Sequence, residues 1–266
     1  MTGLPDPPST EEPRLLSPDD PPAFEVIEDD RGSPFLITCD HAGNRLPRAL
    51  GNLGLPAHEL ERHIAWDLGA AQLTRCLARE LGAFAILQTY SRLVIDCNRP
   101  LHVPSSIPLI SENTAIPGNQ DLSAAAAAER ARAIFKPYHE RIVSEFERRA
   151  RAAQPTVLIA LHSFTPIFQG VARRWHAGML YQRDTRLGRA LLELLRQDPE
   201  LVIGDNQPYS VSDLSDYGVV VYGEGRGIPH VEIEVRQDLL RDEAHQMAWG
   251  TRLAKLLPVA CAKLGS

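Results

Sequence analysis

Two histidines and one glutamate stand at the ends of three separate apolar runs. Short apolar runs bounded by turn residues are typical of buried parallel strands. The runs and their polar residues are 35–39 before His41, 156–161 before His162, and 230–235 around Glu234. In open α/β sheets, reactive groups lie just beyond the carboxyl ends of the strands. Two imidazoles with a carboxylate beside them are typical of a catalytic zinc site, so the pattern predicts metal-assisted chemistry.

The third metal ligand has two candidates, because a catalytic zinc usually takes three protein ligands and leaves one position for water. The position three residues after His41, where a His-x-x-Glu pair would place a carboxylate, holds Asn44. An amide oxygen binds zinc poorly. Asp67 is therefore the best nearby carboxylate, and Asp40 is the other candidate. The competing interpretation is that both histidines bond to backbone and that Asp67 lies on a helix surface or caps a helix.

Glu234 is placed to act as a general base. Glu232 and Glu234 have strand spacing, so both point to the same face of the sheet. Two carboxylates on a buried face are costly unless they are paired or bind a metal. The predicted role of Glu234 is to take a proton from the attacking water beside the metal. The alternative is a structural ion pair with an arginine, for which Arg236 offers a nearby partner.

Arg92, Asn98 and Arg99 flank the end of another expected strand. Arginine binds carboxylates through paired hydrogen bonds, and such charge-assisted bonds are worth about 1.5–3 kcal/mol each. Two arginines and an amide at a strand end therefore predict a site for an acidic substrate. The alternative is ordinary surface ion pairing, which contributes almost nothing to stability.

Composition and charge argue against several classes of function. The chain has 266 residues, a net charge of −6 and a pI of about 5.9, so neither nucleic acid nor a membrane surface is an expected partner. No run approaches the roughly 18 apolar residues that span a bilayer. The N-terminus lacks the basic and apolar segments of a secretory signal. The four cysteines form no CxxC pair, which predicts reduced thiols in a cytoplasmic protein.

The order of elements predicts a single α/β domain. Residues 1–22 are rich in Pro, Asp, Glu and Ser and are expected to form a disordered tail before the domain at 23–266. The expected strands are 24–28, 35–40, 83–88, 92–100, 156–162, 177–181 and 230–235, and the expected helices are 58–81, 124–153, 185–197 and 242–264. This alternation favours a sheet with helices on both faces. Residues 100–120 are expected to form an irregular loop, long enough for a functional lid.

The ordered set of these residues resembles the N-formylglutamate amidohydrolase family. The segments that carry the resemblance are Asp40–Asn44, His63 with Asp67, Ser91–Arg99, Tyr138 with His139, Leu161–Ser163 and Glu232–Arg236. That family is similar in turn to zinc carboxypeptidases and to aspartoacylase and succinylglutamate desuccinylase. The resemblance implies a three-layer α/β/α fold of the phosphorylase/hydrolase-like, zinc exopeptidase-like kind, with a mixed, mostly parallel sheet. It also implies metal-assisted hydrolysis of an N-acyl amino acid.

The resemblance assigns roles to individual residues. It implies His41 and His162 as metal histidines, Glu234 as general base, Arg92 as the oxyanion or substrate arginine, and Asn98 with Arg99 as the pair that holds a substrate carboxylate. To these the residue pattern adds Asp67 as third ligand, and Asn44 as a further substrate-binding residue. The chain departs from the family pattern in two places. The common Pro-His-Ser-Gly is Asp40–Gly43 here, and the carboxypeptidase-like Glu three residues after the first histidine is Asn44.

The leading hypothesis is an amidohydrolase that uses Zn²⁺, Co²⁺ or another divalent ion. Its expected substrate is a small acidic N-acyl amino acid, N-formyl-L-glutamate or a relative. One alternative is a non-catalytic protein that binds acidic ligands on the same fold and has lost the third metal ligand. Another is a zinc peptidase that acts on a short peptide or a cell-wall amide, which a long open cleft would favour. The sequence leaves a homo-oligomer open.

Overall fold

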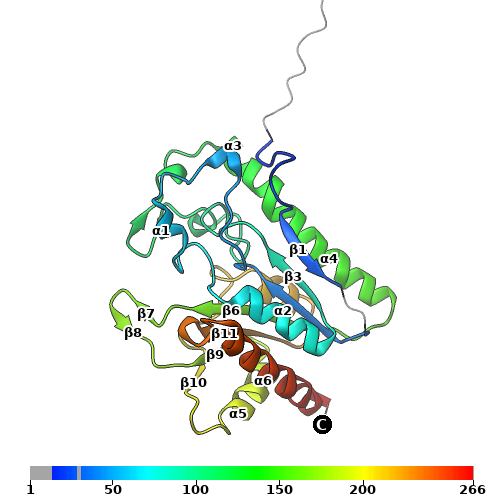
Figure 1. Cartoon of the computed structure of the whole chain (residues 1–266). Helices are drawn as coiled ribbons and strands as arrows, with labels where there is room; N and C mark the ends of the chain where they lie inside the picture. The colour runs from blue at the N-terminus through cyan, green and yellow to red at the C-terminus, as the bar shows by residue number, and fades with distance from the viewer. Residues whose placement is uncertain (1–13, 29–30, 266) are drawn as a thin grey trace, which may run out of the picture.

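The structure is a computed structural model that describes residues 14–28 and 31–265. Its centre is a seven-stranded sheet with the order β1-β3-β2-β6-β11-β9-β10 (Figure 1). The strands are β1 (Phe24–Ile27), β2 (Phe35–Cys39), β3 (Phe84–Gln88), β6 (Val157–Phe164), β9 (Ala177–Leu180), β10 (Ile203–Asp205) and β11 (His230–Arg236). The strands β3, β2, β6 and β11 run parallel, whereas β1 is antiparallel to β3 and β9 is antiparallel to β11. The expected mixed, mostly parallel sheet is confirmed.

Helices cover both faces of this sheet. On one face lie α2 (Ala70–Leu81), α5 (Arg186–Leu195) and α6 (Glu243–Ala262). On the other face lie α4 (Lys136–Arg151) and the π-helical turn Ala131–Phe135 that leads into it. These layers confirm the three-layer α/β/α fold.

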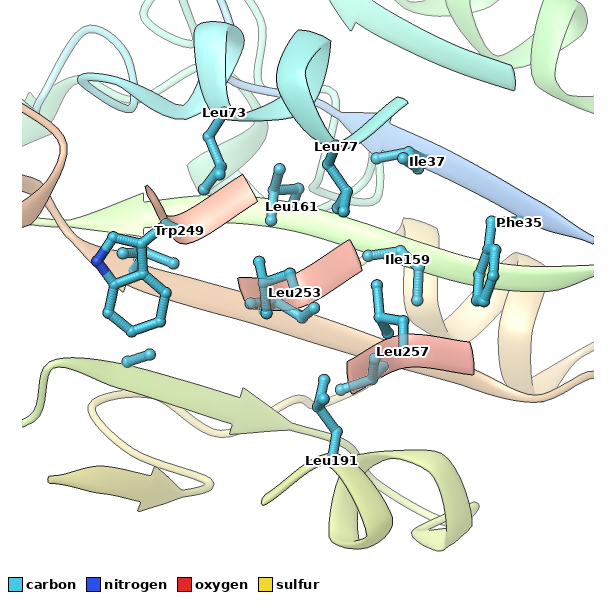
Figure 2. Packing of buried hydrophobic residues seen from close by; sticks show 14 of the residues in the cluster. Phe35, Ile37, Leu73, Leu77, Ile159, Leu161, Leu191, Trp249, Leu253 and Leu257 are labelled. Carbon is cyan, nitrogen blue, oxygen red and sulfur yellow. The ribbon is translucent and has the colours of Figure 1, made fainter. Parts of the chain in front are cut away.

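Alternation along β2 explains how one strand serves both layers. Phe35 and Ile37 belong to the apolar cluster under α2 and α6, whereas Leu36 between them belongs to the cluster under α4. Figure 2 shows Ile37 and the β6 residue Ile159 facing the leucines of α2 and α6, among them Leu253. Leu253 is fully buried, and such burial stabilises a fold by about 1.5–3 kcal/mol per side chain. The carboxyl ends of β2, β6 and β11 are therefore held on a rigid base.

Residues 92–100 form turns, so the strand expected there is wrong. Strand β2 pairs with β3 on one side and with β6 on the other, so residues 92–100 cannot form a strand beside β2. The apolar residues Leu93, Val94 and Ile95 are buried in the cluster under α4 instead. The backbone of the segment bonds to other loops, with the Asp96 N–H donating to the Ser106 carbonyl at 2.7 Å.

The helix expected over 58–81 is interrupted. It consists of α1 (Ala57–Leu60) and α2, with a turn between them that contains Asp67. Gly69 ends the turn at a φ of 81°, and a Cβ there would lie 2.4 Å from Leu240 Cβ, so both backbone conformation and space require glycine. The Asp67 N–H donates to the His41 carbonyl at 2.9 Å. The interruption therefore places Asp67 beside His41.

Residues 14–22 pack against the domain, which corrects part of the tail expected over 1–22. The side chain of Leu15 is buried, and its N–H donates to Glu129 at 2.8 Å. The Tyr90 hydroxyl donates to the Pro21 carbonyl at 2.6 Å. Residues 1–13 of the expected tail lie outside the described residues.

Two short hairpins and the remaining helical segments complete the fold. The hairpins are β4 (Ile110–Ser111) with β5 (Thr114–Ala115), inside the expected 100–120 loop, and β7 (Ile167–Phe168) with β8 (Val171–Ala172). The helix expected over 124–153 begins as α3 (Ala124–Arg130), capped by Ser123, and becomes π-helical just before Pro137. A second π-helical turn covers Val219–Glu224. Within the described residues, no helix combines the length and apolarity needed to cross a bilayer.

Candidate metal centre and active-site cavity

Three neighbouring strands bring the predicted residues together at one edge of the sheet. His41 follows β2, His162 is the third residue from the end of β6, and Glu234 lies opposite His162 in the β6–β11 pairing. The ring centroids of the two histidines are 4.9 Å apart. Their proximity follows from the parallel order β2-β6-β11, because parallel strands end at the same edge.

Asp67 joins the two histidines. One ligand atom from each of these three buried residues lies within 4.8 Å of the others, the arrangement of a possible metal site. Asp67 Oδ2 is 2.9 Å from His162 Nδ1 and 3.5 Å from His41 Nδ1. The interrupted helix, rather than a His-x-x-Glu pair, supplies this carboxylate. Asp67 is thus neither a helix-surface nor a helix-capping residue.

The chemistry of these donors fits a divalent cation such as zinc. Imidazole nitrogen and carboxylate oxygen are ligands that Zn²⁺ binds at three-residue catalytic sites. His41 Nδ1 is buried and has no hydrogen-bond partner among the described residues. A buried polar atom without a partner needs an explanation, and an ion is one.

An outer carboxylate holds His41 from its other side. Asp96 Oδ1 lies 2.7 Å from His41 Nε2, and Arg92 donates to Asp96 Oδ2 through Nε at 3.1 Å and Nη2 at 2.7 Å. A carboxylate on the far nitrogen fixes the tautomer and orientation of a metal-binding histidine. We call Arg92, Asp96 and His41 the His41 arm. Sequence reasoning gave Asp96 no role, although its Arg92-x-x-x-Asp96 spacing was visible.

His162 has a corresponding but looser arrangement. Asp40 Oδ2 lies 3.7 Å from His162 Nε2, and the Tyr138 hydroxyl donates to Asp40 Oδ1 at 2.6 Å. We call Tyr138, Asp40 and His162 the His162 arm. The Asp40 carboxylate thus faces the outer nitrogen of His162, whereas the Asp67 carboxylate lies between the two rings.

The charges of the two arms shift the pKa values of their members. Burial disfavours the ionised form of Asp67, but the charge of His41 and the hydrogen bond to His162 outweigh it and hold the pKa well below its usual range. Burial also opposes ionisation of Asp96, and the Arg92 guanidinium then lowers the pKa of that carboxyl strongly. Burial disfavours the charged form of His162, yet its hydrogen bond to Asp67 raises its pKa above the usual value. The Asp67 and Asp96 carboxylates are therefore held ionised beside positively charged partners.

Glu234 is a buried carboxylate without an ion-pair partner among the described residues. Burial raises its pKa to about 8; Asp67 adds to the rise, while His162 and Arg92 oppose it. Burial, followed by the charge of Asp216, raises the pKa of Glu232 well above its usual value. The expected alternative of an ion pair with Arg236 is wrong, because that arginine pairs with Asp238 at 2.7 Å.

The centre opens into a cavity of about 750 Å³, within the usual range for small-molecule sites. The cavity is lined by Glu234, Glu232 and the candidate ligands, and by residues of both hairpins, among them Ile110, Glu112 and Phe168. The N–H of Gln169 donates to Glu112 Oε1 at 3.1 Å, so the tips of the hairpins are joined beside the cavity. The 100–120 loop is thus placed at the cavity, as expected of a lid.

Of the predicted substrate residues, Arg92, Asn98 and Arg99 line the cavity. Arg99 donates through Nη1 to the Asn98 and Ser215 carbonyls, and the Asn98 side-chain oxygen accepts from the backbone N–H groups of residues 217 and 218. The structure corrects the prediction that Asn44 binds substrate, because Asn44 is not among the residues that line the cavity. Its amide donates to the Leu60 carbonyl at 3.0 Å, so it holds the end of α1.

Solved structures are similar to this chain over most of its length. The gene product Atu2144 from Agrobacterium tumefaciens is 34% identical, with a TM-score of 0.91, and the match covers 95% of this chain and 100% of that one. An N-formylglutamate amidohydrolase from Ralstonia eutropha JMP134 is 19% identical, with a TM-score of 0.66, and the match covers 92% and 99%. At that identity the second likeness supports the fold alone. No curated protein matches the chain.

A protein-family model identifies the family of this chain. The model described as FGase, N-formylglutamate amidohydrolase, matches residues 33–241, which include every residue of both arms and Glu234. The match spans most of the chain and agrees with the resemblance noted in the sequence. This chain therefore belongs to the N-formylglutamate amidohydrolase family.

Proposed function

We propose that this protein is a metal-dependent amidohydrolase that releases the acyl group from a small N-acyl amino acid. N-formylglutamate is the first candidate substrate. One observation carries the proposal: three ligand-type side chains line one cavity of small-molecule size together with Glu234, which has no ion-pair partner in the described part of the chain. Family membership supports amide hydrolysis as the reaction class.

His41, Asp67 and His162 would hold the metal, for which Zn²⁺ is the first choice and Co²⁺ or another divalent ion the alternative. A divalent ion in such a site polarises a carbonyl oxygen and lowers the pKa of water toward 7. The buried Asp96 carboxylate orients His41 for ligation through its Nε2 contact at 2.7 Å.

Glu234 would move the proton. A general base works best when its pKa lies near the working pH, and burial has raised the pKa of Glu234 to about 8. The carboxyl can thus accept a proton from water and return it to the leaving amine. Its neighbour Arg92, whose Nη1 lies 3.7 Å from Asp67 Oδ1, brings a fixed positive charge to the place where the carbonyl oxygen becomes negative.

Arg99 would bind a substrate carboxylate. It lines the cavity, its guanidinium donates only to backbone carbonyls among the described residues, and its remaining N–H groups suit a planar carboxylate. Asn98 would shape this end of the cavity by holding the 217–218 backbone. An acidic N-acyl amino acid meets these requirements, and four free thiols fit the proposed cytoplasmic location.

The non-catalytic alternative was based on a missing third metal ligand. Asp67 offers the carboxylate that position 44 lacks, which weakens that alternative. The proposed activity is tested with metal-stripped protein reloaded with Zn²⁺ or Co²⁺ and assayed for amine release from a panel of N-acyl amino acids. Glu234→Gln is the inactive variant, and the exposed Asp213→Asn is its matched control. We expect turnover by the loaded wild type and control only. Metal-loaded wild type that hydrolyses none of the panel contradicts the proposal.

A further inference from the structure

We propose that Asp40 is the positioning residue for His162: it fixes which ring nitrogen that histidine presents to the metal. The inference rests on the proposed metal site. Asp40 directly precedes His41, yet its side chain is not part of the cavity lining. It is 2% exposed and accepts the Tyr138 hydroxyl at Oδ1. Any influence of Asp40 on a substrate must therefore pass through its neighbours.

The second oxygen of Asp40 faces His162. Asp40 Oδ2 and His162 Nε2 are 3.7 Å apart, and both atoms are buried without a hydrogen-bond partner among the described residues. The two atoms are complementary, since one is an acceptor and the other a potential N–H donor. A shift of less than about 1 Å brings them to the roughly 2.7–2.9 Å of a charge-assisted hydrogen bond.

This pairing decides the tautomer of the ring. An imidazole whose Nε2–H donates to a carboxylate keeps the lone pair of Nδ1 for a metal. Nδ1 of His162 is the nitrogen that lies 2.9 Å from Asp67. His41 shows the same orientation, with Nε2 on Asp96 at 2.7 Å and Nδ1 at 3.5 Å from Asp67. Asp40 is thus to His162 what Asp96 is to His41.

Asp40→Asn tests the inference because it keeps the shape of the side chain. Its amide can donate to Nε2, which places the ring proton on Nδ1 and blocks that nitrogen as a ligand. We expect the Kd for Zn²⁺, measured by competition with a chromophoric chelator, to rise about 10- to 100-fold. At saturating Co²⁺, the visible absorption spectrum should also change. The exposed Asp213→Asn serves as control and should match the wild type in both measurements.

The outcomes separate this inference from the proposed function. Wild type that binds no Zn²⁺ removes the proposed metal site itself. Wild type that binds Zn²⁺, with Asp40→Asn within about twofold and an unchanged Co²⁺ spectrum, overturns the role of Asp40 alone. If Asp40→Asn does not fold, Tyr138→Phe frees the same carboxylate without removing its charge. It should weaken Zn²⁺ binding several-fold, and an unchanged Kd in that variant overturns the inference.

Discussion

Both histidine arms face Asp67 Oδ2, with Nδ1 of His162 at 2.9 Å and Nδ1 of His41 at 3.5 Å, but the two arms are anchored differently. The His41 arm ends on Asp96 and the guanidinium of Arg92, and its outer contact is 2.7 Å. The His162 arm ends on Asp40 and the neutral hydroxyl of Tyr138, and its outer contact is 3.7 Å. A charged anchor needs solvation or pairing, whereas a phenol can be buried at lower cost.

This difference matches the position of each arm. Arg92 and Asp96 line the cavity, so the His41 anchor also presents charge to that cavity. Asp40 and Tyr138 lie in the layer behind it, where Tyr138 is fully buried in the α4 cluster. Under the proposed function, the His41 arm would combine orientation with catalysis, and the His162 arm would only orient its histidine. Substitutions that distinguish these jobs test the comparison.

The largest expected effect is loss of the metal when either arm loses its ring. His41→Ala and His162→Ala should each raise the Kd for Zn²⁺ by at least about 1000-fold, because one of three ligands is gone. Chelator competition measures this, with the exposed His58→Ala as control. A single-arm variant that still binds Zn²⁺ like the wild type would remove that histidine from the site.

Glu234 belongs to neither arm, so its substitution should lower the catalytic rate without weakening metal binding. Glu234→Gln is expected to lower kcat about 10²- to 10⁴-fold, the usual contribution of a general base. Its Kd for Zn²⁺ should stay within a few-fold of the wild type, because Glu234 is not one of the three ligand residues. Initial rates and chelator competition on the same preparation give both values. A large loss of Zn²⁺ affinity would show that Glu234 is itself a ligand.

The two outer carboxylates should differ in their effect on stability. Asp96→Asn leaves the Arg92 guanidinium without its closest carboxylate and should lower the free energy of unfolding of the metal-free protein by about 1–3 kcal/mol. Asp40→Asn leaves a tyrosine that can still donate to the amide oxygen and should cost less than about 1 kcal/mol. Urea unfolding measures both. Equal losses would contradict the charged-versus-neutral distinction.

A further expected effect is a pH dependence of stability behind the His162 arm. His139, next to Tyr138, is buried between the Tyr222 hydroxyl and the Cys97 carbonyl, and burial lowers its pKa to about 3. The unfolded chain, with an ordinary pKa near 6.5, binds the proton first as pH falls. Stability should therefore be lost from about pH 6.5 toward 3, by at most about 1.4 kcal/mol per unit from this residue.

His139→Gln isolates that contribution. The variant should show a shallower decline of the free energy of unfolding between pH 6 and 4 than the wild type does, whatever its stability at pH 7. Urea midpoints across that range give the two slopes. Identical slopes would mean that His139 is not held neutral in the folded protein.

The sequence allowed prediction of those site residues that are positioned by strands. Apolar runs ending in polar residues located His41, His162 and Glu234, since parallel strands end together. Asp67 was also identified, but on a helix that proved to be interrupted at that residue. The break depends on contact between Gly69 and Leu240, which no local pattern reveals.

The outer carboxylates were not predictable in the same way. Asp96 lies 55 residues from its histidine partner, in a segment whose apolar residues read as a strand. Tyr138 lies 98 residues from Asp40 and was part of the family resemblance, which assigned it no role. Asn44 was misassigned because proximity in sequence to His41 suggested a place in the site, whereas its amide bonds to Leu60. Contacts between distant loops set these roles, and periodicity carries no information about them.

The most direct test of the shared centre is an anomalous-difference map from crystals grown with Zn²⁺. The account predicts one peak per chain, about 2.0–2.2 Å from a nitrogen of His41, a nitrogen of His162 and an oxygen of Asp67. A peak that lacks either ring, or zinc bound only elsewhere on the molecule, would contradict it.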